Sequence, residues 1–301
     1  ESLMSSRIAL LAAVFLVVFI LDLPVTKVRS LIRWHFKLLV FSELMDFYKV
    51  DVFGSIITDY EKLVKKYQVN PYLEDIEIPN AKNLTGAVIN TTVNDLKAIR
   101  FSRVEDVDYR KGSASNNREV YFTATGQATN NVPVEGYTMW GRVYKLKMDA
   151  ANPLKGTLEL AVEGDSNPGN GIINPDNLCV TENYVYIQED GDSYYAAAQH
   201  DSYIWQYKIS TKELKPWLTM NHKRTDAAWN STYNQTGEMR FGSWEYGAME
   251  DISDIIGVPD TFTVNIHPHT WQSDAFKNAD GSGTQTNKEG GQTVIIRNVQ
   301  R

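Results

Sequence analysis

Carboxylate and imidazole side chains gather in four short tracts, which hold the residues best suited to chemistry in this sequence. Carboxylate oxygens bind hard cations such as Ca²⁺, and imidazole nitrogens bind softer metals. Clustered carboxylates repel one another unless a cation neutralises them, so the tracts predict at least one bound Ca²⁺. The tracts are Arg103–Tyr109, Asn174–Leu178 with Gln188–Asp192, Gly242–Gly247 and Asn265–Trp271.

The last tract is expected to be a strand that carries a row of imidazoles. Residues two apart on a strand share a face, so Asn265, His267 and His269 would point to one side. Such a row can present nitrogen atoms to a metal. The alternative is a polar strand edge, because Pro268 lacks the N–H that a central strand position needs.

Several common catalytic motifs are absent from the sequence. It contains no GxxxxGK[ST] phosphate loop, no HExxH zinc helix, no GxSxG elbow and no GxGxxG loop. The formal net charge of −7 argues against a nucleic-acid partner, which would need a basic surface. The one cysteine, Cys179, excludes an intrachain disulfide, and beside Leu178 it is expected to be a small buried hydrophobic residue.

The elements that must position these tracts are strands. Beyond Asn94, polar and apolar residues alternate in tracts rich in β-branched and aromatic side chains. About eleven strands with no helices between them favour a β-sandwich or a β-propeller. A closed propeller needs about sixteen strands or more, so it is disfavoured unless residues 1–93 or a partner add strands. The expected strands include 119–125, 142–148, 157–162, 177–181, 184–189, 203–209, 214–220, 261–267 and 293–297.

The first 55 residues are a different kind of sequence, a hydrophobic helical segment. An apolar run from Ile8 to Leu21 follows Arg7, which is typical of a membrane anchor or a signal-like segment. An amphipathic helix is expected from Ser30 to Tyr48. The alternative is that these two helices pack together as a soluble pair.

The sequence therefore divides into three expected parts. Residues 1–55 are the hydrophobic helical segment, and residues 56–93 are a helical and loop linker with a helix over Ile56–Tyr67. Residues 94–301 form a β domain, which contains all four acidic and histidine tracts.

The order of the tracts resembles the PhoX family of alkaline phosphatases over about residues 94–275. That family places an Arg-x-Glu strand before Phe-Thr-x-Thr-Gly, Gly-Arg-Val-Tyr-x-Leu and Pro-Asp-Asn-Leu strands. A strand pair ending Glu-Asp-Gly follows, and then Trp-Glu and the Asn-Ile-His-Pro-His-Thr stretch. The matching tracts are Arg103–Glu105, Phe122–Gly126, Gly141–Leu146, Pro175–Leu178, Glu189–Gly191, Trp244–Glu245 with Asp251–Gly257, and Asn265–Thr270.

The resemblance implies a mainly β, propeller-like domain whose central mouth holds Ca²⁺ and ferric iron. It also implies hydrolysis of phosphate esters outside the cytoplasm, in the periplasm or the extracellular space. Carried over position by position, it implies a set of metal ligands or near-ligands, and it implies that Asn177 orients one of them. The implied ligands are Glu105, Asp176, Glu189, Asp190, Glu245 and His269.

Two departures from the family concern iron. Family members carry a cysteine iron ligand directly before the acidic pair, where this sequence has Gln188. They also have a long propeller segment before the Arg-x-Glu strand, where this chain has its hydrophobic helices. A thiolate holds ferric iron better than a carboxamide does, so iron is expected to be weakly held or absent even where Ca²⁺ binds.

Two functions remain open at this point. The first is a metal-dependent phosphoric monoester hydrolase of the PhoX type, in which metals polarise the phosphoryl oxygens of a phosphate ester. The second is a non-catalytic PhoX-like accessory subunit of a membrane-associated complex, in which a protein partner completes the β domain. In both, the N-terminal helices are expected to contact the membrane.

Overall fold

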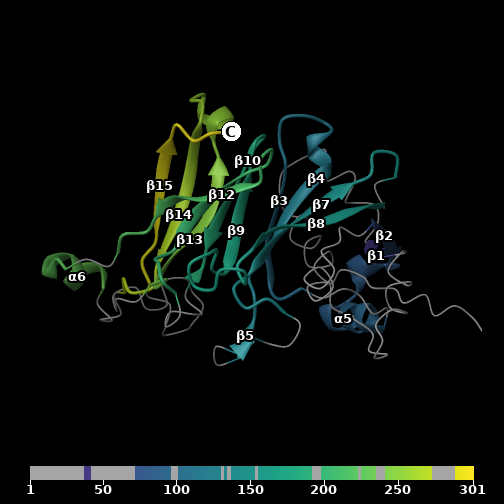
Figure 1. Ribbon diagram of the computed structural model, residues 1–301, viewed down its shortest axis with the longest axis horizontal. Helices are drawn as coiled ribbons and strands as arrows, with labels where there is room; N and C mark the ends of the chain where they lie inside the picture. Colours follow the sequence, from purple (N-terminus) through teal and green to yellow (C-terminus); the bar gives the residue numbers. More distant parts are fainter. Residues whose placement is uncertain are drawn as a thin grey trace, which may run out of the picture. The chain divides into compact units, whose positions relative to one another are not determined.

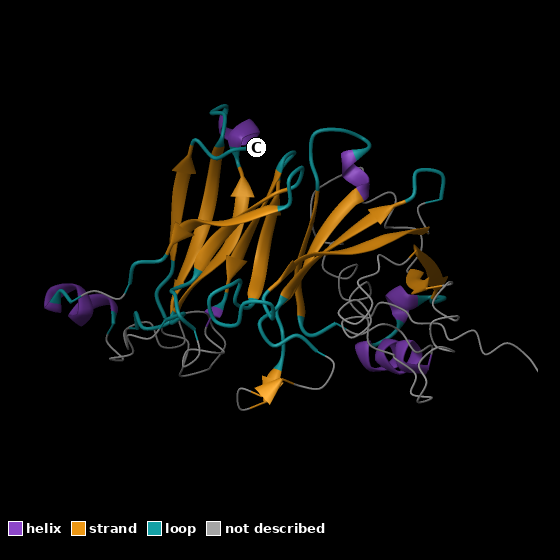
Figure 2. Cartoon of the chain, in the orientation of Figure 1, coloured by secondary structure: helices purple, strands orange, loops and turns teal. Residues whose placement is uncertain are grey.

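The computed structural model of the protein is mainly β, as the sequence predicted (Figures 1 and 2). It describes residues 37–41, 72–95, 101–129, 132–133, 137–152, 155–191, 198–222, 225–234, 241–272 and 289–301. The chain divides into two compact units, Glu1–Thr138 with Val143–Ala161 and Met139–Arg142 with Val162–Arg301. Within the described ranges the sheets form neither a closed barrel nor a closed propeller.

The first unit contains a six-stranded sheet in the order β1-β2-β8-β7-β4-β3. The pairs β1/β2, β2/β8 and β3/β4 are antiparallel. The strands are β1 (Lys37–Phe41), β2 (Tyr72–Glu77), β3 (Val104–Tyr109), β4 (Glu119–Ala124), β7 (Arg142–Met148) and β8 (Lys155–Glu163). Strands β7 and β8 each extend into the second unit, at the start of β7 and the end of β8.

Aromatic rings fill the interior of the first unit. Phe101, Phe122 and Tyr144 are buried, and their ring centroids lie 4.9–5.3 Å apart. Phe101 meets both other rings edge to face, which is a favoured geometry for aromatic pairs. The unit also contains η1 (Ala81–Asn83), α5 (Gly86–Asp95), η2 (Asn116–Arg118) and a ribbon of β5 (Ala128–Thr129) and β6 (Val132–Pro133).

The second unit holds two sheets, in the orders β12-β11-β10-β9 and β13-β14-β15. All of these neighbours pair antiparallel, so each sheet is a meander of consecutive strands. The strands are β9 (Pro175–Val180), β10 (Tyr184–Glu189), β11 (Tyr203–Lys208), β12 (Glu213–Thr219), β13 (Trp244–Asp251), β14 (Thr261–Pro268) and β15 (Gln292–Arg297). Two short helices lie between these strands, α6 (Ala227–Tyr233) before β13 and α7 (Ser253–Ile256) after it, so the expectation of no helices between the strands is wrong here.

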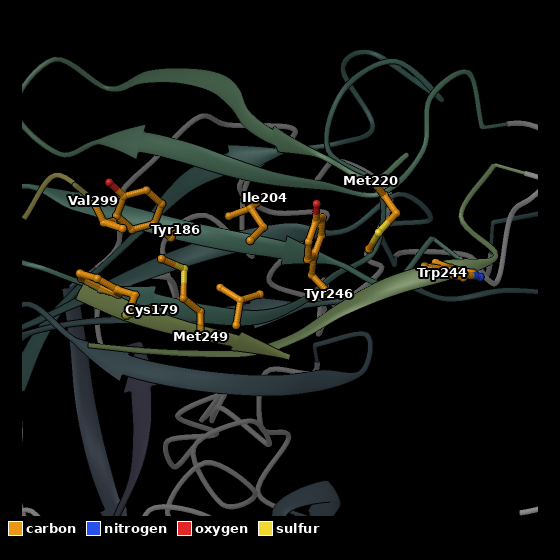
Figure 3. Packing of buried hydrophobic residues seen from close by; sticks show 10 residues of the cluster. Cys179, Tyr186, Ile204, Met220, Trp244, Tyr246, Met249 and Val299 are labelled. Carbon is orange, nitrogen blue, oxygen red and sulfur yellow. The ribbon is translucent and has the colours of Figure 1, made fainter. Parts of the chain in front are cut away.

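One hydrophobic core joins the two sheets of the second unit. Tyr186 and Ile204 come from the first of these sheets, and Tyr246, Met249 and Phe262 come from the second. Figure 3 shows Tyr186 and Ile204 on one side of this layer with Tyr246 and Met249 on the other. The buried Cys179 is also a member of this core, so its predicted role as a buried hydrophobic residue is confirmed.

The predicted strands agree with the observed ones to within two residues at each end. Alternating residue types identify the strands that have one buried face, and tracts rich in β-branched and aromatic residues identify strands such as β10 that are buried on both faces. In β8, for example, buried and half-buried residues alternate over Lys155–Leu158.

The N-terminal part differs from the sequence-based prediction. The helix expected over Ser30–Tyr48 is wrong at Lys37–Phe41, which is strand β1 and pairs with β2 in the register Lys37 to Glu77. Pairing with a distant strand outweighs local helical spacing here. Residues 1–93 therefore add strands to the β domain, and the linker region contributes both β2 and α5.

The remaining N-terminal predictions, for Ile8–Leu21 and Ile56–Tyr67, lie outside the described residues. Of the helices that the structure describes, none is both long enough and apolar enough to cross a membrane.

Candidate functional site

Strand ends and their adjoining segments meet at one end of the second unit. In antiparallel register, the start of β9 faces the end of β10, and the start of β13 faces the end of β14. Gly191 follows β10 and Gly242 precedes β13, and their backbones are in contact. The tracts that contain Asp176, Asp190, Glu245 and His269 therefore lie at this end of the unit.

A glycine pair allows this approach. Gly242 has a φ of +75°, and a Cβ atom on it would lie 2.6 Å from the carbonyl oxygen of Gly191. Only a residue without a Cβ atom fits there without strain. The neighbouring side chains of Asp190 and Glu245 come within hydrogen-bonding reach of each other. Two carboxyl groups in such contact need a proton or a cation between them.

Two histidines and a second glutamate extend the contact into a network, here called the Glu245 cluster (Glu245, His267, His269 and Glu289). His267 Nδ1 lies 2.8 Å from Glu245 Oε1, and His269 Nε2 lies 3.5 Å from the same oxygen. On the other side of its ring, His269 Nδ1 hydrogen-bonds with Glu289 Oε2 at 2.8 Å. His267 and His269 thus face the same carboxylate, as predicted for residues two apart on a strand.

The electrostatics of the Glu245 cluster favour a charged carboxylate. Burial alone would raise the pKa of Glu245, but hydrogen bonds with His267, His269 and Asp190 outweigh it and hold that pKa well below its usual range. The same carboxylate raises the pKa of His267 and, together with Glu289, raises the pKa of His269 to about 9. In the absence of a bound metal, both imidazoles are therefore held in their protonated form more strongly than an exposed histidine.

Asp176 and Asn177 also belong to this end of the unit. The negative charge of Asp176 contributes to the raised pKa of His267, which places the two groups within electrostatic range. Asn177 Nδ2 donates a hydrogen bond to Asp176 Oδ2 at 2.7 Å. This geometry lets Asn177 orient the carboxylate of Asp176, which is the role that the resemblance implied for it.

Glu189 is placed differently from its neighbour Asp190. Its side chain is fully buried and accepts hydrogen bonds from Ile173 N, Tyr203 N and Trp205 Nε1 at 2.6–2.7 Å. Burial raises the pKa of Glu189 to about 8, against the opposing effect of these donors. Both oxygens are engaged by N–H groups, so Glu189 ties the segment before β9 to β10 and β11 instead of facing the Glu245 cluster.

Glu105 and Gln188 also lie apart from the Glu245 cluster. Glu105 is on β3 in the first unit, where it is exposed and forms an ion pair with Arg103 at 3.3 Å. Gln188 is fully buried on β10, and its Nε2 atom lies 3.6 Å from Met249 Sδ inside the core. The position where the family carries an iron-binding cysteine therefore faces apolar side chains in this chain.

The predicted ligand set and the observed arrangement overlap in part. Asp190, Glu245 and His269 are neighbours and Asp176 lies within electrostatic range of His267, whereas Glu105 and Glu189 have the other environments described above. Sequence reasoning did not include His267 and Glu289 among the ligands. His267 could have been found from its two-residue spacing to His269, but nothing in the sequence pairs His269 with Glu289, twenty positions away.

Among the residues that the structure describes, no group of three or more histidine, cysteine, aspartate or glutamate side chains is already arranged to hold a metal ion. No family model, curated protein or solved structure matches this chain. The resemblance to the PhoX family stays a prediction that rests on the tracts themselves.

Proposed function

We propose that this chain is a metal-dependent phosphoric monoester hydrolase of the PhoX type. The observation that carries the proposal is the placement of two imidazoles around the Glu245 carboxylate, with His267 Nδ1 at 2.8 Å and His269 Nε2 at 3.5 Å from its Oε1 atom. The carboxyl group of Asp190 lies within hydrogen-bonding reach of the same carboxylate. A cation between the carboxylates would relieve their repulsion, and a cationic imidazole beside them would attract an anionic phosphate ester.

The residues at this end fit Ca²⁺ better than ferric iron. Asp176, Asp190 and Glu245 supply the carboxylate oxygens that Ca²⁺ prefers, and Asn177 holds one of them in place. Iron would lack its thiolate, because Gln188 faces Met249 in the core. A bound cation would polarise a phosphoryl oxygen, while the imidazoles of His267 and His269 would contact the ester and exclude water from part of its surface.

We also propose that the β domain is propeller-like and incomplete. A propeller blade is a four-stranded antiparallel sheet, and β9–β12 form such a sheet in chain order. The next sheet also has its strands in chain order, from β13 to β15. Its first strand, β13, lies next to β9, the first strand of the preceding sheet, and the first strands of adjacent propeller blades are neighbours in the same way (Figure 1). In the first unit, the four strands β3, β4, β7 and β8 lie side by side in one sheet, and their order across the sheet follows their order along the chain.

The hydrolase would act on a phosphate ester outside the cytoplasm, in the periplasm or extracellular space, with the N-terminal segment as a membrane contact. The test is hydrolysis of p-nitrophenyl phosphate by the full chain after chelation, with Ca²⁺ or iron added back. We expect activity that Ca²⁺ restores and that Glu245→Gln abolishes, while Glu213→Gln on β12 leaves it unchanged. Activity that persists after complete metal removal would contradict the proposal.

A second function, a non-catalytic accessory subunit of a membrane-associated complex, is favoured by the third strand of the last sheet. Among the described strands, β15 pairs with β14 alone, and its Ile295 side chain is 61% exposed. An open strand edge with an apolar side chain can pair with a strand from another protein. A chain that binds Ca²⁺ but hydrolyses no phosphate ester would favour this function over the first.

A further inference from the structure

We propose that Glu245, His267 and His269 bind a divalent transition metal of the zinc or iron(II) class, with Glu289 orienting His269. The proposal uses the cluster on which the proposed hydrolase rests, yet it requires metal binding alone and no hydrolysis. Neither His267 nor Glu289 belongs to the ligand set that the resemblance implied.

The first support is the spacing of the three donor atoms. Ligand atoms at about 2.1 Å from a tetrahedral metal lie roughly 3.4 Å from one another. In the structure, Glu245 Oε1 lies 2.8 Å from His267 Nδ1 and 3.5 Å from His269 Nε2. These atoms do not yet surround a common point, so modest turns of the side chains and the loss of one proton from each imidazole would have to accompany binding.

The second support is the orientation of His269. Its Nε2 atom is buried and lies 3.5 Å from Glu245 Oε1, a long contact that a metal between the two atoms could replace. Its other nitrogen, Nδ1, bonds to Glu289 Oε2 at 2.8 Å. A carboxylate that accepts a hydrogen bond from one ring N–H of a neutral imidazole orients the other nitrogen toward a metal, and such pairs recur at metal sites.

The third support is the space made for His267. Strand β13 has a register shift between Tyr246 and Met249, and Gly247 lies in this irregular segment. A Cβ atom on Gly247 would lie 3.0 Å from His267 Nε2, so a larger residue would displace the ring. The glycine therefore leaves room for the imidazole beside β13, with its Nδ1 atom 2.8 Å from Glu245 Oε1.

The donor chemistry selects the class of metal. Imidazole nitrogen is a ligand for zinc, iron, copper and nickel, whereas Ca²⁺ takes oxygen ligands almost exclusively. Two imidazoles with one carboxylate are the ligand set of several catalytic zinc sites and of non-haem iron(II) sites with open positions. Asp176 and Asp190 would remain beside this metal as oxygen donors for Ca²⁺, with Glu245 common to both sets.

The test is calorimetric titration of the full chain with Zn²⁺ after chelation. We expect one Zn²⁺ per chain, and its binding should persist in a large excess of Ca²⁺ because imidazole nitrogens do not bind Ca²⁺. His267→Gln and His269→Gln should each weaken binding at least about tenfold, and Glu289→Gln should weaken it about tenfold to a hundredfold. Glu213→Gln, a charge-matched change on β12, should have no effect.

Absence of Zn²⁺ binding to the wild-type chain, or unchanged affinity in the His267→Gln/His269→Gln double variant, would overturn the proposal. If the variants fold poorly, Co²⁺ bound to the wild-type chain gives an independent result. We expect visible absorption from one bound Co²⁺ per chain that added Zn²⁺ removes, and failure of Zn²⁺ to displace Co²⁺ would also overturn the site. Zinc binding without phosphatase activity would refute the hydrolase alone, and Ca²⁺-dependent hydrolysis without zinc binding would refute the zinc site alone.

Discussion

Gly242 and Gly191 lie so close that a Cβ atom on Gly242 would be 2.6 Å from the carbonyl oxygen of Gly191. The contact joins the segment after β10 to the segment before β13, and the carboxyl groups of Asp190 and Glu245 meet beside it. Geometry at the candidate site therefore depends on two residues that have no side chain.

Gly242→Ala is expected to destabilise the chain by about 2–4 kcal/mol, because it combines an unfavourable positive φ with a backbone clash. Gly257→Ala is the matched control, since Gly257 also has a positive φ (+67°) but open space around its Cβ position. That change should cost only about 1 kcal/mol. Urea denaturation gives the free energy of unfolding of both variants. Equal losses of this free energy would mean that the contact with Gly191 is unimportant.

Replacing Glu189 should be costly, because three buried N–H groups share its carboxylate as their acceptor. Glu189→Leu should lose about 3 kcal/mol or more of unfolding free energy, and Glu189→Gln, which keeps one acceptor oxygen, should lose less. Glu213→Gln on the exposed strand β12 is the control and should lie within about 0.5 kcal/mol of wild type. Thermal melts followed by circular dichroism test this order of stability losses, and identical melting of Glu189→Leu and wild type would contradict it.

Glu119 should make the stability of the chain depend on acid pH. Burial alone would raise the pKa of Glu119, but Lys145 and Arg110 outweigh it and hold the pKa below 4.5. For a lowered pKa, the stabilisation is present above pH 4.5 and is lost as the pH falls through the folded-state pKa. Glu119→Gln should therefore cost about 1–2 kcal/mol at neutral pH, and this difference should shrink in acid.

The control for Glu119→Gln is the substitution Glu105→Gln in the same sheet. Glu105 and Arg103 form an exposed pair, with side chains 38% and 41% exposed, so this change should cost about 0.5 kcal/mol or less. The difference in free energy of unfolding between wild type and Glu119→Gln should not stay constant down to strongly acid pH. If it does, the ion pairs of Glu119 are not its cause.

Gln188→Met is expected to raise the melting temperature. The buried amide of Gln188 has an oxygen without a hydrogen-bond partner in the described structure, and its nitrogen meets only Met249 Sδ. A methionine fills a similar volume without a buried unpaired oxygen, which should stabilise the chain by about 1 kcal/mol.

Gln188→Cys separates packing from iron binding at the same position. The smaller side chain should leave a cavity that costs about 1–2 kcal/mol. It should bring no iron, because this position faces the core. Stoichiometric iron in purified Gln188→Cys protein, measured by elemental analysis, would mean that the position faces a metal after all.

The sequence predicts the strands of this chain well, for a physical reason. At the start of β8 and along most of β15, the more buried and the more exposed residues alternate, so residue types with a period of two indicate a strand. Strand β1 has no such local signature, because its pairing with β2 joins residues some thirty to forty positions apart. Long-range pairing of this kind cannot be read from local spacing.

The candidate site was predictable only in part for similar reasons. Asp190 and Glu245 were identifiable as acidic residues at strand ends, but their contact depends on the Gly191–Gly242 approach, which residue types alone do not reveal. Glu189 and Asp190 look equivalent in sequence, yet one is fully buried and the other is near Glu245. Adjacent residues at the end of a strand point to opposite faces, and the side with the core is decided by tertiary packing.

The burial of Cys179 has a practical consequence for studying how the second unit opens. It is the only thiol in the sequence, and it lies in the core between the two sheets with 6% of its surface exposed. An alkylating reagent can reach it only when the sheets separate or the unit unfolds. The rate of thiol modification in the native protein therefore reports that separation directly, with no introduced label and no competing cysteine elsewhere in the chain.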